Sequence, residues 1–217
     1  MKLPLFALLL AASFAAAGAP AHASSPFAQA RDQFLAATRG DTAARDAAIE
    51  AFAKLAESQP EHPVYLAYHG AALTLKGRDA SKPWEKMRFA EQGADRIEKA
   101  LARLGPQHDA AIADGSPESI ETRAVAANSL LALPAIMHRG GPGKRALQAA
   151  LDSPLLDGAH AATRASVFGA AARLAAKEGR AADEAQWQRR IVALPANAAG
   201  IAAMRERAAA RLKELGQ

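Results

Sequence analysis

Apolar residues recur at every third or fourth position along this chain, in segments of helical length that end at glycine or proline. That spacing is the period of one face of an α-helix, whereas a half-buried strand alternates at every second residue. Alanine is the most frequent residue and favours helices, while the β-branched residues that favour strands are scarce. The sequence therefore predicts an all-α fold. The clearest segments carry Trp84, Met87, Ala94, Ile97, Leu101 and Leu104, and then Ile201, Met204, Ala208, Leu212 and Leu215.

We expect eight or nine helices, bounded by clusters of Gly, Pro, Asp and Ser. Gly40 can adopt the left-handed conformation after the first helix, and Asp41 or Thr42 caps the second. Ser116 before Pro117 is typical of a helix start with Ser116 as the cap, and Pro134 predicts a kink or an early end of that helix. The expected helical residues are 27–38, 42–59, 65–77, 83–104, 117–133, 144–151, 160–177, 181–193 and 197–215.

Residues 139–143, Arg-Gly-Gly-Pro-Gly, are the clearest interruption of the helical pattern. We interpret them as a connection between helices; a domain boundary and a functional loop are the alternatives. We expect residues 107–115 to be mainly a connection as well. The Asp-Gly pairs at 114 and 157 lack alternating flanks, so neither predicts a β-hairpin. The expectation is one helical domain over residues 24–217, with a sub-boundary near residues 140–143 left open.

The first 23 residues have the three parts of an export signal. Lys2 supplies a positive charge, residues 3–17 form an uncharged apolar run, and Ala21-His22-Ala23 is a cleavage pattern followed by two serines. The run is shorter than the roughly 20 residues that a membrane span needs. We therefore expect cleavage after Ala23 and a protein in the periplasm or secreted, with no stable membrane insertion; an uncleaved anchor is the alternative. The chain has no cysteine, so a disulfide and a thiol nucleophile are excluded.

Small and aromatic residues in the second and third expected helices carry a resemblance to a known family. Ala48, Phe52 and Pro60 match the small, aromatic and proline positions of the second helix of a tetratricopeptide repeat, and Gly70 matches the glycine of the next repeat's first helix. Two partial matches follow, at Gly93, Ile97, Ala100, Leu101 and Pro106, and at Gly169, Gly179, Ala185 and Pro195; the first lies about eleven residues out of register. The resemblance covers roughly half of the chain after residue 23. It implies antiparallel helical hairpins stacked as a tetratricopeptide-like array, an α-solenoid or α-α superhelix.

Catalytic and metal-binding motifs are missing from the sequence. No two histidines are spaced to share one helical turn, and neither HExxH nor GxSxG occurs. Glu85 and Glu121 lack the surroundings that the catalytic acid of a lytic transglycosylase has, and residues 140–144 lack the full phosphate-loop spacing. We therefore predict no enzyme, no metal and no cofactor. An unfamiliar envelope hydrolase stays open, and a His–acid pair in a pocket would favour it.

A basic segment surrounds Trp84, formed by Lys76, Arg78, Lys82, Lys86 and Arg88. Such a segment can bind an acidic peptide or an anionic headgroup, because Trp and Arg are frequent at binding hot spots. We favour the alternative in which Trp84 and Met87 pack in the core and the cations are solvated. We likewise expect Tyr65, Tyr68 and Trp187 to be packing residues before ligand contacts.

The resemblance to tetratricopeptide proteins implies a scaffold or adaptor that binds a protein or peptide in a groove, here within the bacterial envelope. The residues most suited to line that groove are Tyr65, Tyr68, Trp84, Lys86 and Arg88. The alternative is a small-ligand-binding helical accessory of a transport system. The net charge of +5 is spread along the chain, so we predict no nucleic-acid partner.

Overall fold

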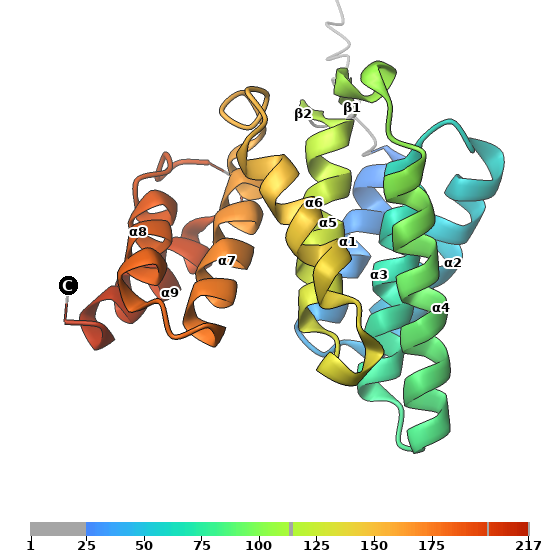
Figure 1. The fold of residues 1–217 in the computed structure, drawn as a ribbon. Helices are drawn as coiled ribbons and strands as arrows, with labels where there is room; N and C mark the ends of the chain where they lie inside the picture. Colours follow the sequence, from blue (N-terminus) through green and yellow to red (C-terminus); the bar gives the residue numbers. More distant parts are fainter. Residues whose placement is uncertain (1–24, 113–114, 199, 217) are drawn as a thin grey trace, which may run out of the picture.

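The computed structural model describes residues 25–112, 115–198 and 200–216, and within these ranges the chain is mostly helical (Figure 1). The all-α prediction is therefore confirmed. The predicted export signal lies outside the described residues. Among the described helices, none is both long and apolar enough to cross a membrane. In chain order the elements are α1 (Pro26–Thr38), α2 (Thr42–Ser58), α3 (Pro63–Asp79), α4 (Pro83–Ala102), the 3₁₀ turn η1 (Pro106–Asp109), β1 (Ala111–Ile112), β2 (Ser116–Pro117), α5 (Glu118–Ala132), the 3₁₀ turn η2 (Ala135–Met137), α6 (Gly140–Leu151), α7 (Ala161–Lys177), α8 (Ala181–Val192) and α9 (Ala202–Glu214).

The first two helices begin and end as their sequence predicts. The Ser25 hydroxyl accepts the N–H of Ala28 at 3.1 Å and so caps α1. Gly40 takes a φ of 103° just after α1, and the Asp41 carboxylate accepts the N–H of Ala44 at 2.9 Å to cap α2. These caps satisfy backbone N–H groups that have no partner inside the helix.

Consecutive helices pack in pairs: α1 with α2, α3 with α4, α5 with α6, and α7 with α8, while α9 packs on α8. The odd-numbered helices α1, α3, α5 and α7 also contact one another in that order. Figure 1 shows α1 to α6 grouped together, with α7, α8 and α9 forming the other end of the molecule. The odd-numbered helices therefore form a continuous row from one end to the other.

The core divides into two clusters of buried side chains. One joins α1, α2 and α3 and contains four buried aromatic rings; the Phe52 and Tyr68 rings stack with their centroids 4.8 Å apart. The other runs from α4 through α5, α6 and α7 to Ile191, Ile201 and Ala208 at the C-terminal end. Alanine supplies much of both clusters, and its small side chain lets the helices approach closely.

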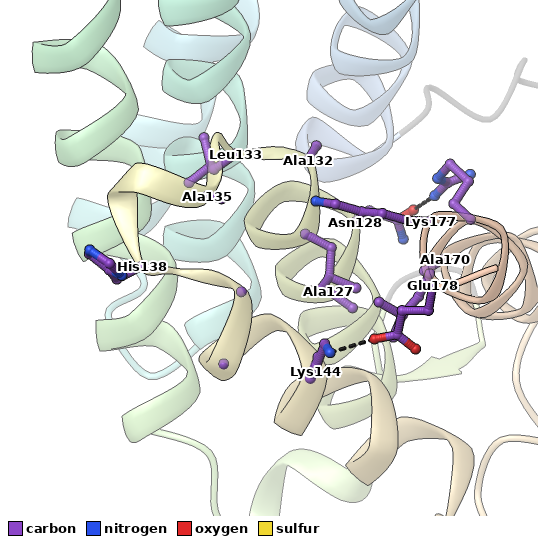
Figure 2. A pocket seen from close by; sticks show the side chains of 15 residues that line it. Ala127, Asn128, Ala132, Leu133, Ala135, His138, Lys144, Ala170, Lys177 and Glu178 are labelled. Carbon is purple, nitrogen blue, oxygen red and sulfur yellow. Dashed lines mark hydrogen bonds and ion pairs between the residues drawn. The ribbon is translucent and has the colours of Figure 1, made fainter. Parts of the chain in front are cut away.

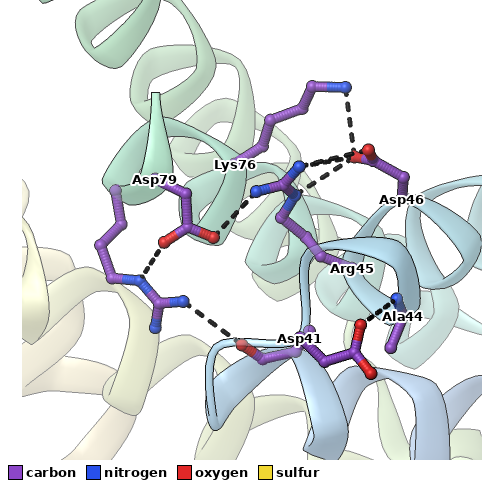
Figure 3. Close-up of polar contacts among 8 residues, drawn as sticks. Asp41, Ala44, Arg45, Asp46, Lys76 and Asp79 are labelled. Carbon is purple, nitrogen blue, oxygen red and sulfur yellow. Dashed lines mark hydrogen bonds and ion pairs between the residues drawn. The ribbon is translucent and has the colours of Figure 1, made fainter. Parts of the chain in front are cut away.

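A charged cluster links α2 to the end of α3 (Figure 3). The guanidinium of the buried Arg45 donates to Asp79 at 2.9 Å and to Asp46 at 3.1 Å. Arg78 donates to the other oxygen of Asp79 at 2.7 Å and to the carbonyl oxygen of Ala37 at 3.3 Å. The hydrogen bond from Arg78, followed by that from Arg45, holds the pKa of Asp79 below its ordinary value. The cluster therefore fixes the C-terminal ends of α1 and α3 to the start of α2.

The chain around Ser116 differs from the prediction. Residues 111–112 and 116–117 pair as an antiparallel two-stranded ribbon, although no hairpin was expected at Asp114-Gly115. Gly115 takes a φ of 82° and its N–H donates to the Ile112 carbonyl oxygen at 2.8 Å, so the two segments pair although their flanks do not alternate. Ser116 is not the cap of α5. Its hydroxyl instead contacts Thr163 and the backbone N–H of His160, both near the start of α7.

Two predicted helix boundaries were also wrong. The glycine-rich residues 140–143 are not a connection, because α6 begins at Gly140. A Cβ on Gly143 would lie 3.0 Å from Leu131, so this glycine lets α6 pack tightly on α5. At the other boundary, α9 begins at Ala202, later than expected, because Gly200 takes a φ of 77° and the chain turns there. The helix before Pro134 does end early, at Ala132, as predicted.

Candidate binding groove

One face of the row of odd-numbered helices is hollowed into a groove of about 910 Å³, which we call the central groove. Its wall includes residues of α1, α3, α5 and α7, the first turns of α4, and Met204 of α9. Along α5 the lining residues recur at helical spacing from Glu121 to Ala132. A helix rises 1.5 Å per residue, so the groove follows α5 for about 16 Å.

A buried carboxylate lies in the wall of the central groove. Glu121 is only 6% exposed; it accepts hydrogen bonds from the Tyr68 hydroxyl and, at 2.7 Å, from the Thr163 hydroxyl. The Ser116 hydroxyl contacts that of Thr163 at 2.8 Å, and the His160 N–H donates to Ser116 at 3.1 Å. These bonds join α3, α5 and α7 at one end of the groove, and all the donors are neutral.

The opposite end of the groove exposes large apolar side chains. Leu35 of α1 is 45% exposed and Met87 of α4 is 40% exposed, and both line the groove. Trp84 is 65% exposed, and its neighbours Pro83 and Lys86 also line the groove. Our expectation that Trp84 and Met87 pack in the core is therefore wrong.

Trp84 is exposed because of the place where α3 and α4 meet. At this end of the pair, a Cβ on Gly77 would lie 2.8 Å from the backbone of Lys86 and 3.0 Å from that of Ala90. Trp84 comes before this contact, in the first turn of α4, so it has no facing turn of α3 to cover it. The apolar period of the sequence continues through α4, but the neighbouring helix ends too early to bury its beginning.

Cations surround this exposed end. Lys86 is exposed and lines the groove, as does Arg78. The Lys82 ammonium lies 5.5 Å from the centre of the Trp84 ring, and the Arg88 guanidinium lies 4.6 Å from that of Phe89. These distances are typical of cation–π contacts. The exposed end of the groove is therefore both apolar and basic.

The structure separates the five residues that the sequence proposed for partner binding. Tyr68 and Lys86 line the central groove, and Trp84 lies beside it. Tyr65 is buried against Phe27, with ring centroids 5.4 Å apart, and burial followed by the negative charge of Glu118 raises the pKa of its phenol. Arg88 is exposed but does not line the groove.

Sequence reasoning missed three features of the groove: Glu121, Thr163 and Leu35. Glu121 was considered only as a catalytic acid. The sequence did contain an indication of its role. Glu121 lies on the same helix face as Ala124, Asn128 and Ala132, so it is a charged residue on a face whose other residues are small or uncharged. The partners of Glu121 come from α3 and α7, more than forty residues away in each direction, and no local pattern indicates them.

A second cavity of about 780 Å³ lies next to the central groove, between α5, α6 and α7 (Figure 2). Lys144 forms an ion pair with Glu178 across it, and this pair, followed by Arg180, lowers the pKa of Glu178. Asn128 lines both cavities: its amide donates to Ser166 of α7 at 3.0 Å, and its oxygen accepts from Arg173. Asn128 therefore joins α5 to α7 between the two cavities.

A His–acid pair occurs elsewhere, where His62 Nδ1 lies 2.9 Å from Glu118. Neither residue lines either of the two cavities, and the other oxygen of Glu118 accepts the N–H of Val64 at 3.2 Å. The pair thus holds the start of α3. In the described part of the chain, no three His, Asp or Glu residues are placed to bind a metal ion. The absence of an enzyme activity, a metal and a cofactor stays a prediction.

Neither a protein-family model, nor a curated protein, nor a solved structure matches the chain.

Proposed function

We propose that the chain is a tetratricopeptide-like array of helical hairpins that binds a segment of a partner protein in the central groove, as a non-catalytic scaffold or adaptor in the bacterial envelope. The observation that carries this proposal is the identity of the helices around the groove. The first helix of each pair, α1, α3, α5 and α7, contributes to its wall. In a stack of hairpins, the first helices form one face of the array, and such faces are used for binding.

The repeat register supports the same interpretation. Gly70 and Gly93, which the resemblance singled out, face each other between the first and second helix of one pair. The residues that put Gly93 out of register lengthen this pair: α3 has 17 residues and α4 has 20. The proposed array therefore contains one long hairpin, and the extra turn of α4 forms the basic, apolar end of the groove.

The shape of the groove favours an elongated occupant. A groove that follows α5 for about 16 Å accommodates roughly five residues of extended chain, at about 3.3 Å each. Leu35 and Met87 offer exposed apolar surface, which stabilises a complex when it is buried. Lys86 and Arg78 favour an acidic group at the same end.

Crosslinking followed by peptide binding tests this proposal. A photoreactive amino acid in place of Leu35, in the groove, identifies the partner segment in cells, and a synthetic peptide of that segment is then titrated against the purified chain. Lys86→Glu should weaken peptide binding about tenfold, because it reverses a charge in the groove wall.

Arg88→Glu is the matched control, since it makes the same charge change on the same helix outside the groove wall. It should alter the affinity by no more than about twofold. Equal losses in the two variants, or a peptide that does not bind, would remove the central groove as the binding surface.

The proposed envelope location rests on residues 1–23. Amino-terminal sequencing of the protein from a periplasmic fraction should begin at Ser24. A start at Met1 in the membrane fraction would contradict cleavage.

A small-ligand-binding accessory is the second candidate. The groove volume of about 910 Å³ lies within the range of small-molecule sites, and Glu121, Tyr68 and Thr163 offer the few convergent polar groups that such sites use. Native mass spectrometry of the chain purified from its own cells distinguishes the two. A small molecule that is bound to the unaltered chain and absent from the Lys86→Glu variant would favour this candidate over the adaptor.

A further inference from the structure

Three glutamates are buried among the described residues, and they differ in the groups that contact their carboxyl oxygens. Glu118 lies 2.9 Å from the His62 ring, and Glu184 accepts from the Arg211 guanidinium at 2.7 Å. The contacts of Glu121 come instead from two neutral hydroxyls, those of Tyr68 and Thr163. Glu121 is also the buried glutamate that lines the central groove.

This difference is physically significant. A carboxylate removed from water is costly unless hydrogen bonds or a cation compensate it, and two hydroxyls compensate only part of that cost. Each carboxylate oxygen has two lone pairs, so two donors leave acceptor capacity unused. A group of this kind in a cavity wall is suited to receive a cation from an occupant of the cavity.

We propose that the occupant of the central groove carries a cationic group, the ammonium of a lysine or the guanidinium of an arginine, which pairs with Glu121. This inference rests on the proposed function and specifies what the bound segment contains. Helix α3 gives the distance between Glu121 and the basic end of the groove, because Tyr68, which contacts Glu121, and Gly77, which packs on Lys86, are both on α3. Nine residues of helix separate them by about 14 Å.

The groove therefore has an acidic end at Glu121 and a basic end at Lys86 and Arg78. The segment that it fits has a basic residue and an acidic residue roughly four positions apart in extended conformation. The apolar wall along α5 then faces the intervening side chains. Arg31 also lines the groove, 5.7 Å from the centre of the Phe27 ring, and adds a positive charge to its wall.

Three probes of one chain length test this inference on the purified full chain: n-octylammonium, n-octanol and octanoate. Their binding is followed by NMR chemical shifts of groove residues. We expect octylammonium to bind about tenfold more tightly than octanol. Glu121→Gln, which keeps the side-chain shape, should abolish this preference and leave octanol binding unchanged. Glu91→Gln, at an exposed glutamate of α4 outside the groove wall, is the matched control and should preserve it.

Glu121 is buried, so circular dichroism must show that the Gln variant folds. A measurement on the unaltered chain gives an independent result: the side-chain carboxyl ¹³C resonance of Glu121 should shift with octylammonium and stay in place with octanol. If octylammonium binds equally to the unaltered chain and to Glu121→Gln, or if the carboxyl resonance does not shift, the cationic anchor, that is, the pairing of the occupant's cation with Glu121, is overturned. Octanol binding in the same experiment would still support the groove. If none of the three probes shifts groove resonances, both the groove and the anchor are overturned.

Discussion

Gly70 of α3 and Gly93 of α4 pack so closely that a Cβ on either glycine would lie 2.5 Å from the carbonyl oxygen of the other. A Cβ on Gly70 would also lie 2.8 Å from Ile97, and one on Gly93 would lie 2.6 Å from Thr74. Carbon atoms do not approach backbone oxygens this closely, so the two helices can keep their distance only while both positions are glycine. The groove depends on this contact, because α3 forms part of its wall and α4 its exposed end.

Gly70→Ala should therefore destabilise the chain. In an exposed helix interior this change stabilises by about 0.5–1 kcal/mol, but here the backbones must separate, and overpacking of this kind costs about 1–3 kcal/mol or more. We expect a net loss of about 1–2 kcal/mol, measured by urea unfolding. Gly140→Ala is the control, since a Cβ there meets nothing within 4 Å. Equal stability of the two variants would show that α3 and α4 separate without cost.

The sequence predicted the glycines of this contact better than it predicted the groove. Helix existence follows from local apolar spacing, so most boundaries were right. Gly70 was singled out because its distance from Pro60 matches the spacing between the proline of one repeat and the glycine of the next. The exposure of Trp84 depends on where α3 ends, and the role of Glu121 depends on hydroxyls from two distant helices. No pattern of fixed spacing in the sequence indicates either relationship, so both could be seen only in the three-dimensional structure.

Glu118 should stabilise the start of α3 from outside that helix. α3 has no side-chain cap of its own at His62, and Glu118 of α5 accepts the Val64 N–H instead. Glu118→Ala removes the acceptor for that buried N–H and for His62, and should lower the free energy of unfolding by about 1–3 kcal/mol. Glu118→Gln keeps an oxygen for Val64 and should cost less. Urea unfolding measures both, and a larger loss for Gln than for Ala would contradict the capping role.

His69 should make the chain less stable in mild acid. Burial, followed by the positive charge of Arg96, lowers its pKa from 6.5 to about 4. Between these values the unfolded chain binds a proton that the folded chain does not, so stability is full above pH 6.5 and falls as the pH decreases towards 4. The loss between pH 7 and pH 5 should be on the order of 1–2 kcal/mol.

Replacing this ring tests the assignment. His69→Gln should reduce the difference in unfolding free energy between pH 7 and pH 5, and His138→Asn, at an exposed histidine, is the control for removing an imidazole. An NMR titration of the His69 ring protons gives the pKa directly. A midpoint near 6.5 would contradict the desolvation of this side chain.

The two tryptophans of the chain should report opposite environments. Trp84 is 65% exposed, whereas Trp187 is partly buried and stacks on Phe168 with ring centroids 6.0 Å apart. A Trp187→Phe variant, which retains Trp84, should emit at longer wavelength and be quenched more strongly by acrylamide than a Trp84→Phe variant. Trp84→Phe should also leave the free energy of unfolding within about 0.5 kcal/mol, because exposed positions contribute little to stability. Similar emission from both variants would place Trp84 in the core. Because Pro83 and Lys86 line the central groove on either side of Trp84, emission from the Trp187→Phe variant should also change when a peptide enters the groove.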